Sequence, residues 1–175
     1  GVVSCFASLL ISRPLGALGL YSDEIYTAVD AVRLALFGAA LPEELAKLAM
    51  LWLMLRRSRH FDQRLDGIVY AGCIGLGFAG LENIGYIVQS YMSGGAWITT
   101  AVSRALFAVP GHFFFGVIMG FFYALATFSS RRYRGLNLFL AWSLPILAHG
   151  LYDGVLMGMG TVDNYVAGIL LIVFL

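Results

Sequence analysis

The sequence predicts an all-α fold: a polytopic helical membrane protein with about five to six transmembrane segments in one bundle. Of its 175 residues, 60% are hydrophobic and 12% are charged, whereas soluble domains carry about 25% charged residues. The mean hydropathy is +0.84. Such a chain has too little polar surface to cover a water-soluble globule, so composition alone favours the membrane class.

Apolar segments follow one another along the whole chain. They cover residues 1–20, 27–55, 67–92, 97–128, 136–160 and 165–175. The middle four are long enough to span, since a crossing needs about 20 residues. Arg13 and Pro14 interrupt the first, so we expect a short helix over Val2–Ile11 and then an interfacial turn. We predict a single integral-membrane domain over 1–175, with its motif-bearing core at residues 27–160.

The loops between these segments alternate in charge. Arg56–Arg64 holds four arginines and Ser129–Gly135 holds three, whereas Ser93–Ala96 and Thr161–Asn164 hold none. The positive-inside rule therefore places loops 56–64 and 129–135 in the cytoplasm. This alternation is what successive helical crossings produce, and it supports the segmentation.

Several other functions find no support. The net charge is +1 and no basic patch is present, so nucleic acid is not an expected partner. Cys5 and Cys73 lie in apolar runs without CxxC spacing, and we interpret them as small core residues. The stretch Gly75–Gly80 has the letters of a dinucleotide fingerprint, but it lies inside an apolar helix rather than after a strand. The glycines of this helix, Gly72, Gly75, Gly77 and Gly80, are expected to permit close helix packing.

Ionisable residues interrupt four of the apolar segments. They are Glu43, Glu44, Lys47, Glu82, His112, His149 and Asp153. Counted from the Arg-rich ends of their helices, the catalytic candidates among them, that is all but Lys47, lie about 11–17 residues away, or about 17–25 Å at 1.5 Å per residue. Four helices therefore carry polar groups to one layer, where each charge costs about 2.5–3.5 kcal/mol. We expect these groups to face one another or a water-filled cavity.

Helical spacing suggests how these groups pair. His149 and Asp153 are four residues apart and share a helix face, and Lys47 is one turn from both Glu43 and Glu44. Adjacent helical residues point about 100° apart. We therefore expect one glutamate to act on a reacting water, and the other to orient that water or to pair with Lys47.

Other side chains near this layer are given simpler interpretations. Pro42, Pro110 and Pro145 precede ionisable residues and are expected to distort the helices there. Arg104 lies near the outer end of its helix and is expected to snorkel to the interface. The aromatic residues Phe107, Phe113, Phe114, Phe115, Phe121 and Phe122 are expected to face lipid or to pack between helices.

The residue types point to activation of water, by one of two routes. In the first, His112, His149 and a carboxylate (Asp153 or Glu82) hold Zn²⁺, and a glutamate takes the proton of the water. In the second there is no metal: a glutamate activates water directly, while His149 and Asp153 stabilise the oxyanion. Each group also has a purely structural interpretation, as an ion pair or a buried hydrogen bond.

The order of these motifs resembles a known family. They are E-E-x-x-K (Glu43, Glu44, Lys47), F-x-x-x-E-N (Phe78, Glu82, Asn83), a lone histidine (His112) and H-x-x-x-D (His149, Asp153). Together they resemble the PrsW family of bacterial intramembrane proteases, over about residues 40–154. That family is similar to the CAAX prenyl endopeptidase and bacteriocin-immunity superfamily, which includes the scaffold subunit of γ-secretase. The CAAX enzymes have histidine at the position of Glu82 and often asparagine at that of Asp153, so this chain resembles PrsW more closely.

The resemblance implies an intramembrane endopeptidase that hydrolyses a peptide bond of a membrane protein, such as an anti-sigma factor. The implied catalytic residues are Glu43, Glu44, Glu82, His149 and Asp153; the implied ligands of a Zn²⁺ cofactor are His112, His149, Asp153 and Glu82. The expected partners are the lipid bilayer and a single-pass membrane protein or peptide, in a bacterial or archaeal cell (inner) membrane. A metalloprotease is preferred to a metal-free glutamate-type protease.

Two other classes remain open. A proton-coupled transporter would also place acids and histidines near the midplane, although the sequence shows no inverted repeat. A non-catalytic membrane scaffold would keep the fold, although the glutamate pair is complete here. The sequence leaves open the oligomeric state, the substrate and which of the two glutamates is the base.

Overall fold

The computed structural model describes residues 1–158, and these contain helices and no strand, which confirms the all-α class. The elements are α1 (Val2–Ala17), α2 (Ala28–Arg33), η1 (Leu34–Ala40), α3 (Leu41–Leu55), α4 (Arg64–Met92), α5 (Trp97–Ser103), η2 (Arg104–Ala108), α6 (Val109–Phe128), η3 (Arg131–Tyr133) and α7 (Arg134–Gly158). The predicted loop Thr161–Asn164 and segment 165–175 lie outside the described residues.

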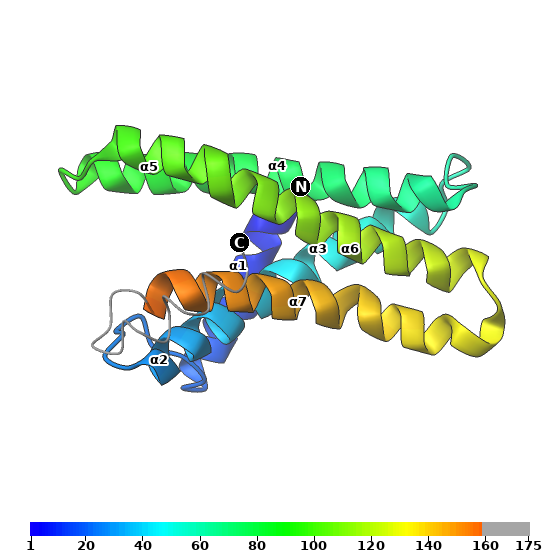
Figure 1. The fold of residues 1–175 in the computed structure, drawn as a ribbon, viewed down its shortest axis with the longest axis horizontal. Helices are drawn as coiled ribbons and strands as arrows, with labels where there is room; N and C mark the ends of the chain where they lie inside the picture. Colours follow the sequence, from blue (N-terminus) through cyan, green and yellow to red (C-terminus); the bar gives the residue numbers. More distant parts are fainter. Residues whose placement is uncertain (159–175) are drawn as a thin grey trace.

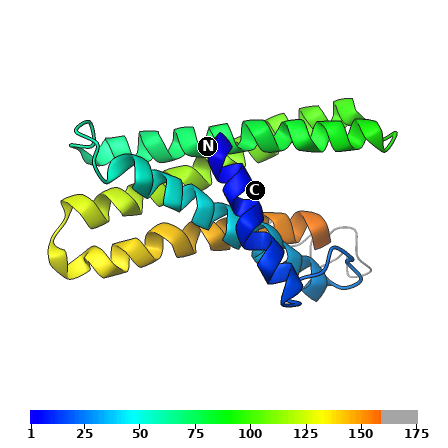
Figure 2. The ribbon, with the colours of Figure 1, turned by 180° about the vertical axis from the view of Figure 1, so that it is seen from behind.

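The long helices run antiparallel to their neighbours in the chain (Figure 1). Helix α4 packs along α6, α6 along α7, and α1 crosses the bundle obliquely against α3 and α4, as Figure 2 shows from behind. Three helical stretches are long and apolar enough to cross a membrane: Arg64–Met92, Trp97–Phe128 and Arg131–Gly158. The chain is therefore a helical protein suited to a lipid bilayer.

The first helix is longer than predicted. We expected it to end at Ile11, but α1 continues through Arg13 and Pro14 to Ala17. Proline removes one backbone donor from the helix, and near the end of a helix that loss affects only one hydrogen bond. The helix ends where Gly19 adopts a φ of +71°, a left-handed conformation that terminates helices.

Two of the helices change their hydrogen-bond register just before a proline. The Leu41 N–H donates to the Leu36 carbonyl, and the Val109 N–H donates to the Arg104 carbonyl, so these turns are of the π type. Pro42 and Pro110 follow directly. Proline offers no N–H to the carbonyl four residues earlier, so a regular α-helix would leave that carbonyl without its donor. In the π turn the N–H groups bond to carbonyls five residues earlier, which changes the pairing of the carbonyls in this region. The predicted distortion near these two prolines is present.

Close packing of α4 on α6 depends on glycine. A Cβ on Gly75 would overlap the backbone carbonyl of His112, and a Cβ on Gly116 would lie 2.5 Å from the carbonyl oxygen of Ala71. The expectation that glycines allow close helix contact is correct for Gly75. It is wrong for Gly80, because none of the described residues lies within 4 Å of a Cβ placed there.

This difference makes Gly75 and Gly80 a matched pair for a test. Gly75→Ala is expected to lower the free energy of unfolding by about 1–3 kcal/mol, because the new methyl group must push α4 away from α6. Gly80→Ala is expected to be neutral or to raise it by about 0.5–1 kcal/mol, since alanine favours helix. Unfolding by SDS titration in mixed micelles measures both. Equal effects at the two positions would contradict this account of the α4–α6 contact.

Candidate active site

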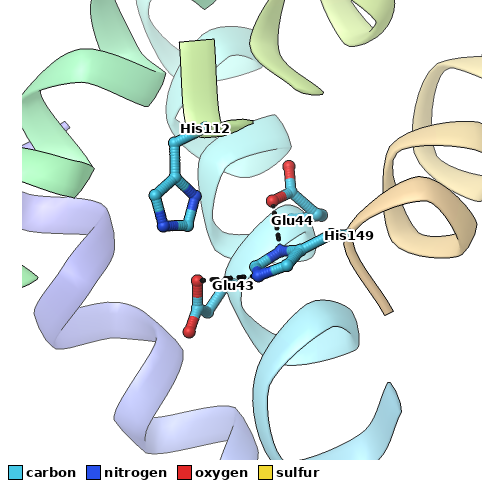
Figure 3. A group of neighbouring side chains, drawn as sticks. All are labelled: Glu43, Glu44, His112 and His149. Atoms are coloured by element: carbon cyan, nitrogen blue, oxygen red, sulfur yellow. Dashed lines mark hydrogen bonds and ion pairs between the residues drawn. The ribbon is translucent and has the colours of Figure 1, made fainter. Parts of the chain in front are cut away.

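Four of the predicted site residues come together from three helices (Figure 3). Glu43 and Glu44 lie in the first turn of α3, His112 on α6 and His149 on α7. One donor atom from each of these four residues lies within 4.8 Å of the others. The shared layer expected from the sequence is thus a compact cluster of side chains, with Glu82 reaching it from α4.

Lys47 is the centre of the cluster and the only lysine in the sequence. Its Nζ lies 2.8 Å from Glu44 Oε1 and 3.7 Å from Glu43 Oε2. The same Nζ lies 2.8 Å from His112 Nδ1, and it sits 4.0 Å from the centre of the Phe78 ring. The predicted pairing of lysine with a glutamate is confirmed, and the closer partner is Glu44.

These contacts determine the tautomer of His112. An ammonium group donates hydrogen bonds and cannot accept them, so the Nδ1 atom that faces Lys47 must be the acceptor. The proton of the neutral ring then lies on Nε2, which is 3.0 Å from Glu82 Oε2 and donates to it. His112 therefore links Lys47 on α3 to Glu82 on α4.

His149 is held between carboxylates. Its Nδ1 lies 2.9 Å from Glu44 Oε1, and its Nε2 lies 3.1 Å from Asp153 Oδ2 and 4.0 Å from Glu43 Oε2. The predicted contact between His149 and Asp153 on one face of α7 is confirmed. A ring with protons on both nitrogens donates to Glu44 and Asp153 at once.

Two aromatic residues border these groups. The Phe115 ring stacks on the His149 ring with centroids 4.9 Å apart and planes inclined by 17°, and Phe78 lies 5.3 Å from the His112 ring. Phe115 was not recognised from the sequence as a residue of the site. Its spacing could have indicated this, because it follows His112 by three residues and so lies on the same helix face. Phe107 and Phe114 are exposed, as expected for lipid-facing residues.

Arg104 does not snorkel as predicted. Its guanidinium turns inward, donates from Nη2 to Glu82 Oε2, and donates from Nε to Asn83 Oδ1 at 2.7 Å. The side chain is only 19% exposed. The acceptors, Glu82 and Asn83, belong to α4, and the sequence around Arg104 alone does not show that α4 lies beside it.

Burial divides the cluster into a deep part and an accessible part. Glu44 is fully buried, whereas 12% of the Glu43 side chain and 20% of the Asp153 side chain are exposed. Glu43 Oε2 and Glu44 Oε2 are buried and have no hydrogen-bond partner among residues 1–158. Two unpaired carboxylate oxygens at such a position are costly unless water or a cation satisfies them.

The donor set fits a metal ion of the kind predicted. Two carboxylates and two imidazoles are nitrogen and oxygen ligands that Zn²⁺ accepts, and the two oxygens without a hydrogen-bond partner belong to Glu43 and Glu44, two residues of this set. The clustered donors are Glu43, Glu44, His112 and His149. Of the predicted ligands, Asp153 and Glu82 instead contact the outer nitrogens of the two histidines.

Fold and site together define a class: a helical membrane protein with a largely buried cluster of glutamates, histidines and a lysine. The whole chain, residues 1–175, matches the family described as PrsW family intramembrane metalloprotease. The chain belongs to this family, and the resemblance seen in its motifs is confirmed.

Several curated relatives carry the name Protease PrsW. The protein from Geobacillus kaustophilus is 34% identical over 157 residues, which are 90% of this chain and 64% of the relative. The Oceanobacillus iheyensis protein is 39% identical over 73% of this chain and 56% of the relative. The Bacillus subtilis protein is 40% identical over 67% of this chain and 51% of the relative. This chain thus spans about half to two thirds of their length. No solved structure shows significant similarity to it.

Proposed function

We propose that this chain is an intramembrane endopeptidase that hydrolyses a peptide bond of a membrane-protein substrate, with Glu43 as the general base. The observation that carries the proposal is the pair of buried glutamates with unpaired oxygens beside two histidines. Membership of the PrsW family supports the same reaction. We propose Glu43 rather than Glu44 because Glu43 is partly accessible, whereas Glu44 Oε1 already accepts from Lys47 and His149.

The other polar groups take roles that follow from their contacts. Glu44 holds Lys47 and His149 in place, and Asp153 orients His149 from the accessible side. In hydrolysis Glu43 would take a proton from a water molecule while the oxygen of that water attacks the carbonyl carbon of the peptide bond. Glu43 would later pass the proton to the departing amine. In a metal-free mechanism, His149 Nε2, which lies 4.0 Å from Glu43 Oε2, would be the donor best placed to stabilise the oxyanion.

We propose Zn²⁺ as the cofactor, held by Glu44, His112 and His149, which would leave Glu43 free to act as the base. When bound, the ion would polarise the peptide carbonyl and lower the pKa of a bound water. The fit of the donor set and the description of the family as metalloproteases support this route. The alternative is a metal-free glutamate protease, and one contact favours it: Lys47 already supplies a positive charge beside Glu44 and His112.

Metal content distinguishes the two routes. About one zinc per chain is expected in protein purified without chelators or metal-affinity columns, because four nitrogen and oxygen donors converge. Elemental mass spectrometry measures it, and His112→Ala and His149→Ala are expected to lose the metal. His60→Ala is the matched control, because His60 lies in an Arg-rich loop away from the cluster. Protein that hydrolyses its substrate with no zinc, and binds none when it is added, would establish the metal-free route.

We also propose how the chain lies in a bacterial cell membrane. Loops 56–64 and 129–135 share one end of the bundle (Figure 1), as cytoplasmic loops must. Beyond the three long apolar helices, α1 and the continuous helix 28–55 would bring the number of spans within residues 1–158 to five. Labelling of single cysteines placed in the two loops, from each side of sealed vesicles, tests this: labelling of either loop from the outer side excludes the orientation.

The substrate is proposed to be a single-pass membrane protein, such as an anti-sigma factor, that reaches the site within the bilayer. Relatives named Protease PrsW support a protein substrate. A non-catalytic scaffold or a proton-coupled transporter would keep the cluster without hydrolysis. Reconstitution in liposomes decides: cleavage of a co-reconstituted substrate supports the protease, and proton-driven flux without cleavage supports the transporter.

A further inference from the structure

Arg104 is attached to helix α4 by three contacts. Its Nη2 donates to Glu82 Oε2, its Nε donates to Asn83 Oδ1 at 2.7 Å, and its Cζ lies 3.8 Å from the centre of the Tyr86 ring. The three partners are within five residues of one another on α4. A planar guanidinium with contacts at two nitrogens and one face has a defined orientation, which a flexible ammonium would lack.

One oxygen joins Arg104 to the site. Glu82 Oε2 accepts from Arg104 Nη2 and also from His112 Nε2 at 3.0 Å. Arg104 has only donors, so this oxygen must offer lone pairs to both groups. Arg104 therefore holds the acceptor that keeps the His112 proton on Nε2, and His112 Nδ1 stays free to accept from Lys47. A continuous series of hydrogen bonds runs from Arg104 to the centre of the cluster.

The π turn explains how Arg104 and His112 can reach the same oxygen. They are eight residues apart on one continuous helix, and in a regular α-helix that spacing leaves them about 80° apart around the axis. The stretch Arg104–Ala108 is a π-helix, in which each residue turns the chain through a smaller angle. The smaller rotation reduces the offset, so both side chains face Glu82.

We propose that Arg104 is a positioning residue, which acts through Glu82 to hold the ring of His112 in its orientation beside Lys47. The structural coupling stands on the contacts alone. Its consequence for hydrolysis rests on the proposed function. In that function the contact of Arg104 with Glu82 keeps His112 in the arrangement that holds Lys47 beside Glu44. Partners that orient a histidine in this way commonly change activity by about 10–100-fold when removed.

The coupling is measurable without a substrate. The chain has three histidines, His60, His112 and His149, so ¹⁵N-histidine labelling in detergent micelles gives few ring signals, assigned with His60→Gln and His112→Gln. In protein freed of metal, wild-type His112 is expected to show a protonated Nε2 and an unprotonated Nδ1. Arg104→Gln is expected to shift both signals, because Glu82 is then free to move relative to Nε2.

Arg33→Gln is the matched control, because Arg33 is an exposed arginine at the end of α2. It is expected to leave the His112 signals unchanged. If Arg104→Gln changes them no more than Arg33→Gln does, the proposal is wrong. If Arg104→Gln fails to fold, Asn83→Ala takes its place, because it removes one contact of the guanidinium. It should shift the ring signals of His112 in the same direction. Unchanged signals would overturn the proposal.

Kinetics provide the second measurement. Arg104→Gln is expected to lower kcat about 10–100-fold with KM unchanged. The double variant Arg104→Gln/Glu82→Gln is expected to be no slower than Glu82→Gln alone, because both act through one oxygen. Additive losses, or a change confined to KM, would contradict a role through Glu82. If the wild type cleaves nothing, the proposed function fails, and the ring signals still decide the role of Arg104.

Discussion

Glu43→Gln is expected to abolish hydrolysis, with a loss in kcat of about 10²–10⁴-fold, while the protein remains folded. The amide has nearly the same shape as the carboxylate but cannot take a proton from water. Because the Glu43 side chain is partly accessible and its Oε2 has no hydrogen-bond partner among the described residues, few structural contacts are lost. Cleavage of a reconstituted substrate and the melting temperature are measured on the same preparation.

Glu44→Gln separates the two glutamates. Glu44 is fully buried, and its Oε1 accepts from Lys47 at 2.8 Å and from His149 at 2.9 Å. Its substitution should therefore lower the melting temperature as well as activity, and Glu24→Gln, at an exposed glutamate, should change neither. Full activity in Glu43→Gln, with activity lost in a normally stable Glu44→Gln, would reverse the assignment.

Lys47→Met is expected to destabilise the protein by about 3–5 kcal/mol, the usual cost of removing one partner of a buried ion pair. The Lys47 side chain is 1% exposed, and its ammonium is shared by Glu44 and His112. Methionine fills a similar volume but leaves the carboxylate and the imidazole nitrogen without a donor. SDS titration in mixed micelles measures the free energy of unfolding.

A control and a double variant show whether the charge of Lys47 is what stabilises the protein. Arg59→Met removes an exposed basic residue and should cost less than about 0.5 kcal/mol. Glu44→Gln/Lys47→Met should cost less than the sum of the two single changes, since the second removes the charge that the first has left unpaired. Strict additivity would show that Lys47 stabilises by packing against Phe78 and not by pairing.

Much of the site follows from local spacing. The contact between His149 and Asp153, and that between Lys47 and Glu44, are within one turn of a helix, so their geometry is a property of the helix itself. The common depth of the groups follows from counting residues along apolar helices. The end of α1 could not be predicted in this way, because Pro14 was given more weight than it has in a last turn.

The contacts between helices could not be predicted. His112 lies 65 residues from Lys47 and 30 from Glu82 in the chain, and their pairing depends on how α6 rotates against α3 and α4. That rotation depends on the π turns, on the glycine contact between Gly75 and the His112 backbone, and on packing. Arg104 was assigned to the interface for the same reason: its acceptors belong to another helix.

Composition and helical periodicity are sufficient for the membrane class, the long helices and the glutamates, histidines and lysine of the cluster, because each is a property of a single segment. Which residue binds which, the tautomer of His112 and the division between a buried Glu44 and an accessible Glu43 depend on the tertiary structure. The physical reason is that these properties arise from distances between atoms on different helices. Such distances are determined by the way the whole bundle packs.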